Sequence, residues 1–399
     1  MLFVSLHKHW ASRAPGNALL INLFSPHYVS SRVRREQGEI ALFVAGKAHI
    51  MRFQAPVLYT HCVSSESPSM SLRFALPTLL LSLVASSLQP QQGRLLVTQK
   101  GTQSLAIVDP GSGRILASVP EGGITGHEVI ASPDGRFAYV PIYSNVGVGK
   151  AGTNGQIIDV IDIAAQKVVS SFDFGHGVRP HCPLIGPKDG LLYVSTEIEQ
   201  SITIIDPKTL KIVGTIPTGQ PQSHMFTLSH DGRRAYTANV GPGTVSVLDV
   251  PGRKVVKIIP ISSNTQRIAI TPDDRWVFTA DQVVPRLVVI DTVTDKVNSS
   301  IPLEGIAYGT APTADGRWLL VTLPDQNKIA VVDLQSMKVV RSVPVGAYPQ
   351  EVLIRPDGKV AYVSCMHSDQ VAEIDLAKWT LTRLIPTGKD TDGLAWAGQ

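Results

Sequence analysis

The chain has 399 residues, a formal net charge of +4, and 17% charged and 43% apolar residues. This composition excludes an intrinsically disordered chain, and 33 glycines with 28 prolines suit many short strands joined by turns. The excess positive charge lies in residues 1–69, which hold seven basic and three acidic residues, whereas residues 70–399 hold 29 of each. No net basic charge therefore points to nucleic acid or an anionic membrane surface as a partner.

Residues 1–69 show neither sustained helical nor sustained strand periodicity. They are interpreted as an unassigned N-terminal extension, as the product of a mis-set start codon, or as a genuine presequence, and the sequence leaves these alternatives open.

The segment 70–87 has the order of a secretory signal peptide. Arg73 follows Met70, an apolar run covers residues 74–84, and three small residues end the segment. The run is too short for a membrane span, and a buried helix of the fold is the alternative. We therefore expect a secreted or periplasmic protein, without an integral membrane segment, whose mature chain begins near Leu88.

A repeat organises the region 88–399. An apolar strand ending in Asp recurs seven times, at intervals of 53, 44, 43, 42, 42 and 42 residues, and its final residues are Asp109, Asp162, Asp206, Asp249, Asp291, Asp333 and Asp375. Asp-Gly turns, often preceded by Pro, recur with the same step, and such dipeptides favour tight turns. In the last repeat the predicted strands are 351–355, 360–365, 371–375 and 380–385. Four short strands on a period near 42 residues are typical of a β-propeller blade.

The ends of this region complement each other. The first repeat lacks its own first strand, whereas residues 393–397 match a first strand with nothing after it. The C-terminal strand is therefore predicted to close a ring of seven blades, giving an all-β monomer without an open edge. The long first interval reflects an insertion, residues 143–155, between the second and third strands of blade 2. Cys182 and Cys365 fall four blades apart, so no disulfide is expected.

Three second-strand segments carry a family resemblance. Tyr193-Val194-Ser195-Thr196, Tyr236-Thr237-Ala238-Asn239 and Tyr362-Val363-Ser364-Cys365 resemble the YVTN family of bacterial seven-bladed propeller repeats. The resemblance covers about residues 93–399 and implies a seven-bladed β-propeller. It does not choose a function, because similar propellers include lactonases, lyases, subunits of amine dehydrogenases and binding scaffolds.

The start of each first strand carries a polar residue. From blade 1 to blade 7 this column reads Asp392, His127, His181, His224, Gln266, Tyr308 and Gln350. Because the innermost strands begin at the mouth of the central channel, these side chains are expected to converge there.

Three histidines on consecutive blades predict a metal site. His127, His181 and His224 could ligate one divalent transition metal, such as Zn²⁺, Cu²⁺, Mn²⁺ or Ni²⁺, and leave a position open for water or substrate. The candidate catalytic acids and bases are Asp392, Tyr308 and Glu128. A ligand-binding ring without metal, or a water-filled polar channel mouth, are the alternatives.

Further candidates lie on the same face. Arg179 and Arg267 are suited to a carboxylate or phosphate of the substrate, although a salt bridge between blades is an equal alternative for Arg267. Gln266 and Gln350 are candidate substrate contacts. The Gly-rich insertion 143–155 is expected to act as a lid or binding loop. Cys182 is predicted to belong to the core, because neighbouring residues of a strand point to opposite sides.

These features support several functions. The first is an exported enzyme for a small organic molecule, a metal-assisted lyase or lactone hydrolase. The second is a non-catalytic propeller that binds a ligand or a protein partner, and the third is a propeller subunit of a redox complex. The chain lacks the Cys-x-x-Cys-His motif for covalent haem, which disfavours independent redox chemistry.

Overall fold

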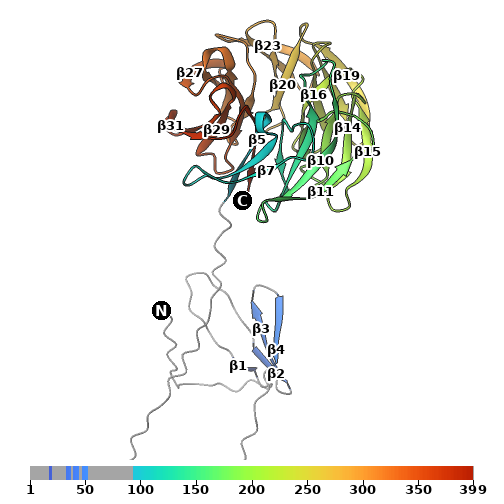
Figure 1. The fold of residues 1–399 in the computed structure, drawn as a ribbon, viewed down its shortest axis with the longest axis vertical. Helices are drawn as coiled ribbons and strands as arrows, with labels where there is room; N and C mark the ends of the chain where they lie inside the picture. The colour runs from blue at the N-terminus through green and yellow to red at the C-terminus, as the bar shows by residue number, and fades with distance from the viewer. Residues whose placement is uncertain (1–17, 20–32, 37–38, 45–46, 53–92, 399) are drawn as a thin grey trace, which may run out of the picture. The chain divides into compact units, whose positions relative to one another are not determined.

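A computed structural model of the chain describes residues 18–19, 33–36, 39–44, 47–52 and 93–398 (Figure 1). It divides the chain into two units, Met1–Val84 and Ala85–Gln399. The predicted signal peptide, 70–87, lies outside the described residues.

The first unit contains a small antiparallel sheet that the sequence did not predict. Its strands follow the order β1 (Ala18–Leu19), β2 (Val33–Glu36), β3 (Glu39–Val44) and β4 (Lys47–Arg52). Strands of at most six residues are too short to show a sustained period, which explains why the pattern was missed.

The second unit is a ring of seven four-stranded antiparallel sheets. Blade 1 consists of β32 (Thr391–Ala397), β5 (Arg94–Gln99), β6 (Ser104–Asp109) and β7 (Arg114–Pro120). Blade 2 consists of β8 (Ile130–Ala131), β9 (Phe137–Ser144), β10 (Asn154–Asp162) and β11 (Lys167–Asp173). Blade 3 consists of β12 (Pro180–Ile185), β13 (Leu192–Thr196), β14 (Ser201–Asp206) and β15 (Lys211–Pro217). Blade 4 consists of β16 (Ser223–Leu228), β17 (Arg234–Asn239), β18 (Thr244–Asp249) and β19 (Lys254–Pro260). Blade 5 consists of β20 (Thr265–Ile270), β21 (Trp276–Asp281), β22 (Arg286–Asp291) and β23 (Lys296–Pro302). Blade 6 consists of β24 (Thr310–Pro312), β25 (Trp318–Leu323), β26 (Lys328–Asp333) and β27 (Lys338–Pro344). Blade 7 consists of β28 (Pro349–Ile354), β29 (Val360–Cys365), β30 (Gln370–Asp375) and β31 (Thr380–Pro386).

The C-terminal strand closes the ring, as predicted. β32 pairs with β5 in antiparallel register, with Leu394 opposite Val97 and Ala395 opposite Leu96. The C-terminus accordingly lies beside blade 1 in Figure 1. The first strand of blade 1 thus comes from the other end of the repeat region, and the all-β, seven-bladed architecture is confirmed.

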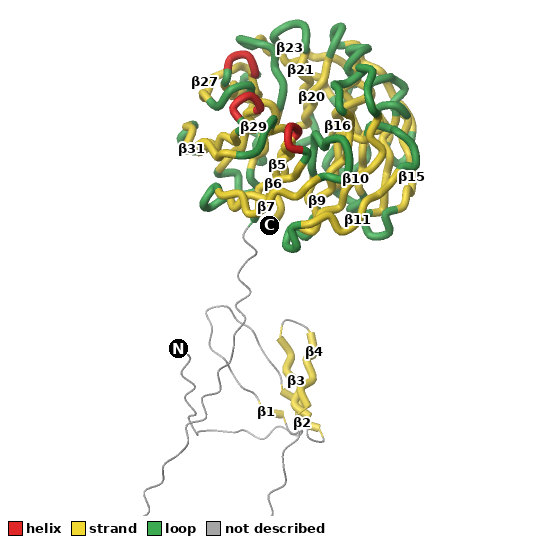
Figure 2. Tube along the Cα trace, in the orientation of Figure 1, coloured by secondary structure: helices red, strands yellow, loops and turns green. Residues whose placement is uncertain are grey.

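The helical segments of the propeller are three short 3₁₀ turns, coloured red in Figure 2. They are η1 (Lys100–Thr102), η2 (Pro324–Gln326) and η3 (Met366–Ser368), and each follows the second strand of its blade. Within the described part of the chain, no helix has the length and hydropathy needed to cross a bilayer.

The repeated residues serve packing and turns. Tyr236, Phe278 and Tyr362 are almost completely buried. Tyr236 of blade 4 packs in one cluster with Ile268 and Ile270 of blade 5, so the second-strand aromatic fills the space between blades.

The first strands of neighbouring blades contact one another and line the centre of the ring. Their pairing with the second strands is irregular at the start. The register shifts between Thr391 and Leu394, Pro180 and Pro183, Ser223 and Met225, Thr265 and Ile268, and Pro349 and Val352. A bulge of this kind re-aims neighbouring side chains, and these shifts coincide with the polar column at the channel mouth.

Candidate functional site

The structure brings the three predicted histidines together. The ring centroids of His127 and His181 are 5.6 Å apart, and those of His181 and His224 are 3.6 Å apart. Their order around the channel follows the order of blades 2, 3 and 4, so His181 is the central member of the row.

A tyrosine that the sequence did not single out as a site residue packs against this row. Tyr143, at the end of β9, has ring centroid distances of 4.9 Å to His127, 4.8 Å to His181 and 5.4 Å to His224. Its side chain is fully buried, and its hydroxyl donates a hydrogen bond to Glu197 Oε2. The phenol therefore occupies space beside all three imidazoles.

The imidazoles are held in the neutral form. Burial lowers the pKa of His127 to about 4 and lowers the pKa values of His181 and His224 well below the usual value. The Nδ1 atoms of His181 and His224 are buried and have no hydrogen-bond partner. Across the described residues, no three His, Cys, Asp or Glu side chains form a group that could hold a metal ion.

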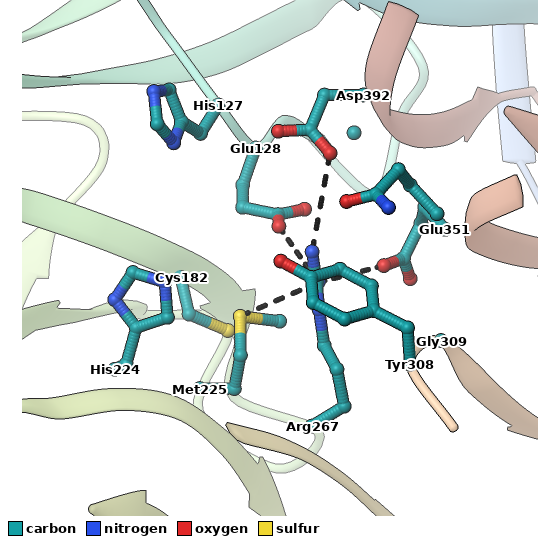
Figure 3. Close-up of polar contacts among 12 residues, drawn as sticks. His127, Glu128, Cys182, His224, Met225, Arg267, Tyr308, Gly309, Glu351 and Asp392 are labelled. Atoms are coloured by element: carbon teal, nitrogen blue, oxygen red, sulfur yellow. Dashed lines mark hydrogen bonds and ion pairs between the residues drawn. The ribbon is translucent and has the colours of Figure 1, made fainter. Parts of the chain in front are cut away.

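An ion-pair network crosses the channel next to the histidines (Figure 3). Arg267 of blade 5 donates hydrogen bonds of 2.8 Å to Glu128, which precedes β8 in blade 2, and of 2.8 Å to Glu351 of blade 7. Its guanidinium also lies over the ring of Tyr308, 4.4 Å from the centroid, and its side chain is only 3% exposed. The salt-bridge alternative for Arg267 is the one that the structure shows, so this guanidinium is already engaged by carboxylates.

Asp392, from the C-terminal strand, completes the network. Its Oδ2 lies 2.9 Å from Lys100 Nζ, and its Oδ1 lies 4.0 Å from Arg267 Nη2 without a hydrogen-bond partner. Burial alone would raise the pKa of Asp392, but Lys100, His127 and Arg267 together lower it below its usual range.

The pKa values of the two glutamates of the network shift upwards, in the opposite direction to the pKa of Asp392. Burial raises the pKa of Glu128 to about 8, and burial also raises the pKa of Glu351. Arg267 opposes the shift at both glutamates without cancelling it. These shifts favour the protonated form of Glu128 and the ionised form of Asp392 at neutral pH.

The two predicted amide contacts lie in the same ring. Gln266 donates a hydrogen bond of 3.1 Å from Nε2 to the Tyr308 hydroxyl. Gln350 is 4% exposed, and its backbone oxygen accepts hydrogen bonds from Gly309 and Thr322. Burial raises the pKa of Tyr308, so its phenol stays protonated and can donate a hydrogen bond.

Arg179 holds the insertion loop and is not free to bind a substrate anion. Its guanidinium donates to Asn154 Oδ1 at 2.6 Å, to the Lys150 oxygen at 2.7 Å and to Glu197 Oε1 at 3.3 Å. Glu197 also accepts a hydrogen bond of 3.0 Å from the Gly149 nitrogen. The insertion is thus anchored at the channel mouth, on the side of the three histidines, which is the face where it was expected. The ion pair between Arg179 and Glu197 that holds it is almost completely buried.

Four contributors were missed as site residues: Lys100, Tyr143, Glu197 and Glu351. A signal for Glu351 was present, because it follows Gln350 just as Glu128 follows His127 and Arg267 follows Gln266. Cys182, the equivalent residue of blade 3, is a free, buried thiol in an apolar cluster, as predicted.

The fold and the channel mouth define the chain as a seven-bladed β-propeller with a polar, ion-paired channel mouth. Residues 236–358 match a family model described as a YNCE-like beta-propeller. A segment of 136 residues is 30% identical to a seven-bladed beta-propeller protein of Mycobacterium tuberculosis, covering 33% of this chain and 31% of that protein. The match thus spans about a third of the length of that relative.

Solved structures agree on the fold. Hydrazine synthase of Kuenenia stuttgartiensis matches with a TM-score of 0.61 and 21% identity, covering 70% of this chain and 91% of that one. A functionally unknown protein of Desulfotomaculum acetoxidans matches with a TM-score of 0.63 and 13% identity, covering 76% and 99%. At these identities the likeness concerns the fold alone. The resemblance to seven-bladed propeller repeats is confirmed.

Proposed function

We propose that the channel mouth is the active site of an enzyme for a small organic molecule, a lyase or a lactone hydrolase, with Glu128 and Asp392 as its acid and base. The observation that supports this proposal is a pair of buried carboxyl groups beside one guanidinium whose pKa values shift in opposite directions. Such a pair divides the acid and base roles near neutral pH.

The chemistry follows from these protonation states. In a lyase, ionised Asp392 removes a proton from carbon while Glu128 gives its proton to the leaving group. In a lactone hydrolase, Asp392 takes a proton from the attacking water and Glu128 protonates the ring oxygen as its bond to the acyl carbon breaks. Tyr308, whose phenol stays protonated, would donate a hydrogen bond to the oxygen that gains charge.

The test is turnover of a panel of lactones and of substrates prone to β-elimination. Because Glu128 must hold its proton, kcat/KM should fall above about pH 8. Glu128→Gln should lower kcat/KM by about 10²- to 10⁴-fold. Glu304→Gln, in an exposed ion pair with Lys328, is the control and should keep full activity. Undiminished turnover by Glu128→Gln would exclude this role.

Binding of a transition metal by the histidines is a second candidate function of the channel mouth. It is supported by the unpartnered Nδ1 atoms of two neutral, buried imidazoles, His181 and His224. In the described residues no three His, Cys, Asp or Glu side chains are grouped for a metal, and Tyr143 packs against all three rings. A three-histidine site would therefore need Tyr143 to yield space and the histidines to rearrange. When bound, a metal would polarise a substrate carbonyl or lower the pKa of a water molecule.

Metal analysis of the purified full chain tests this candidate. His181→Ala should abolish bound metal, because His181 neighbours both other histidines. His230→Ala is the control, since His230 pairs with Asp274 on an exposed turn and should leave the metal content unchanged. A wild-type chain that takes up no Zn²⁺, Cu²⁺, Mn²⁺ or Ni²⁺ at pH 7.5 would contradict it.

A further inference from the structure

A pocket lies between blades 4 and 5, at the end of the blades opposite the channel mouth. Its volume is about 460 Å³, which falls in the range of small-molecule sites, about 300–1,000 Å³. Blade 4 contributes Arg233, Arg234 and Asp249 to the lining, and blade 5 contributes Ile270 and Asp274. Ile270 is the last residue of the first strand of its blade, whereas the channel mouth surrounds the beginnings of these strands.

The pocket is found where blade 4 departs from the repeat. In blades 2, 5 and 6 the arginine that ends the turn before the second strand lies over the ring of the next residue, 4.2–4.6 Å from its centroid. These pairs are Arg136–Phe137, Arg275–Trp276 and Arg317–Trp318. In blade 4 the aromatic residue is replaced by Arg234, which pairs with Asp295 of blade 5 at 2.7 Å. None of the described aromatic rings therefore covers Arg233.

Most charged groups of the lining are already engaged. Arg234 pairs with Asp295, which lies in the next blade. Asp274 accepts hydrogen bonds from His230, of 2.6 Å from the ring Nδ1 and of 2.9 Å from the backbone nitrogen. Asp231 accepts hydrogen bonds within its own turn. A ligand would have to break existing contacts to use these groups.

Arg233 and Asp249 are the charged groups of the pocket that stay open. Within the described part of the chain, neither has an ion-pair partner within 4.0 Å, and the guanidinium of Arg233 donates no hydrogen bond. Oδ1 of Asp249 accepts a hydrogen bond of 3.1 Å from the Gly252 nitrogen, which leaves Oδ2 for a ligand. The equivalent residues of blades 2 and 5 pair with each other, Arg136 with Asp162 at 3.5 Å and Arg275 with Asp291 at 2.6 Å.

Apolar side chains form another part of the lining. They are Val256 of β19, Ile270 of β20 and Val293, which follows β22. Ile270 is buried, whereas Val256 and Val293 are 48% and 77% exposed. An apolar group bound here removes part of the valine surface from water, which favours binding.

We propose that this pocket is a second binding site, for a small zwitterion of the α-amino acid class, whose carboxylate binds Arg233 and whose ammonium group binds Asp249. A guanidinium binds a carboxylate through two parallel hydrogen bonds, and an ammonium group offers donors to the free oxygen of Asp249. A ligand with a single charge engages only one of the two groups. The site is independent of the proposed active site at the channel mouth.

The experiment titrates three probes of similar size into the full chain, followed by ligand-observed NMR. They are L-valine, isovalerate, which lacks the ammonium group, and isobutylammonium, which lacks the carboxylate. L-valine should bind at least about tenfold more tightly than either, because it makes both charge-assisted contacts. Arg233→Gln should weaken binding of L-valine about tenfold and leave that of isobutylammonium unchanged. Asp249→Asn keeps the acceptor for the Gly252 nitrogen, and should weaken L-valine while leaving isovalerate unchanged.

Blade 6 supplies the matched controls. Arg317→Gln and Asp333→Asn change the equivalent residues, which do not line this pocket, and should leave the affinity for L-valine unchanged. The proposal is overturned if L-valine does not bind, if a probe with one charge binds as tightly, or if both blade 4 variants keep the wild-type affinity. An equal loss of affinity in the blade 6 variants also overturns it, because binding then does not depend on the pocket.

Discussion

Arg267→Met isolates the ion pairs that cross the channel. The substitution keeps much of the side-chain length but removes the partner of two buried carboxyl groups, Glu128 and Glu351, each bonded to the guanidinium at 2.8 Å. Removing one partner of a buried ion pair destabilises a protein by about 3–5 kcal/mol. Because burial raises the pKa of Glu128 to about 8, protonation neutralises part of the negative charge at pH 8, and we therefore expect the lower end, about 3 kcal/mol.

The loss of stability in Arg267→Met should depend on pH, and the pKa values of the two glutamates determine in which direction. Without Arg267, the folded-state pKa values of both glutamates rise further above those of the unfolded chain. Groups of this kind cost stability as pH rises above the unfolded-state pKa, and the cost disappears as pH falls and both carboxyls protonate. The destabilisation should therefore shrink from about 3 kcal/mol at pH 8 to about 1 kcal/mol at pH 5.

Urea unfolding of wild type and variant at both pH values measures this difference. Arg383→Met is the matched control, because Arg383 pairs with Glu373 at 2.6 Å while its side chain is 30% exposed. A partly exposed pair of this kind contributes about 1 kcal/mol or less. If the two variants lose the same stability at pH 8, or if the loss in Arg267→Met does not depend on pH, the channel-crossing network does not have the role assigned to it.

The remaining predictions concern the two ends of the propeller. Deleting residues 390–399 removes β32, so β5 loses its inner partner and cooperative unfolding in urea should be abolished. A sharp transition like that of the wild type would contradict the closure of the ring by the C-terminal strand. We also propose export on the strength of the pattern in residues 70–87, and N-terminal sequencing of the mature protein should then place its start near Leu88; a start upstream of Met70 would refute this.

The sequence predicted the fold because the repeat is carried by residues that every blade needs. The Asp at the end of each third strand and the Asp-Gly turns recur at a nearly constant step, and the unmatched strand at 393–397 reveals the closure. The same logic located the polar column, since a residue type that differs between blades at one position has no common structural role.

The charge network was harder to predict, for physical reasons. Alternation along a strand places neighbours such as Gln350 and Glu351 on opposite sides, but the register shift at the start of β28 breaks this rule. The pairing of Arg267 with Glu128 joins residues 139 positions apart across the ring, and no local pattern encodes that distance. Tyr143 lies at the end of a second strand, outside the first-strand column that marks the channel mouth in the sequence.

The residues that build the blades also fix the site. Thr98 of β5 donates a hydrogen bond of 2.9 Å to the His127 oxygen and accepts one of 2.8 Å from Gly393, the neighbour of Asp392. Thr322 makes the equivalent link in blade 6: it donates to the Gln350 oxygen at 2.8 Å and accepts from the nitrogen of Gly309 at 2.6 Å.

Each hydroxyl therefore ties the first strand of its own blade to the first strand of the next, at the height of the polar column. Ser195 repeats this link between blades 3 and 4, where its hydroxyl donates to the His224 oxygen at 2.7 Å and accepts from the Cys182 nitrogen at 3.0 Å. Satisfying these buried backbone groups at the bulges holds consecutive site residues in place. The small hydroxyl residue of the second strand thus serves both the repeat and the channel mouth, so ring closure and site assembly depend on the same hydrogen bonds.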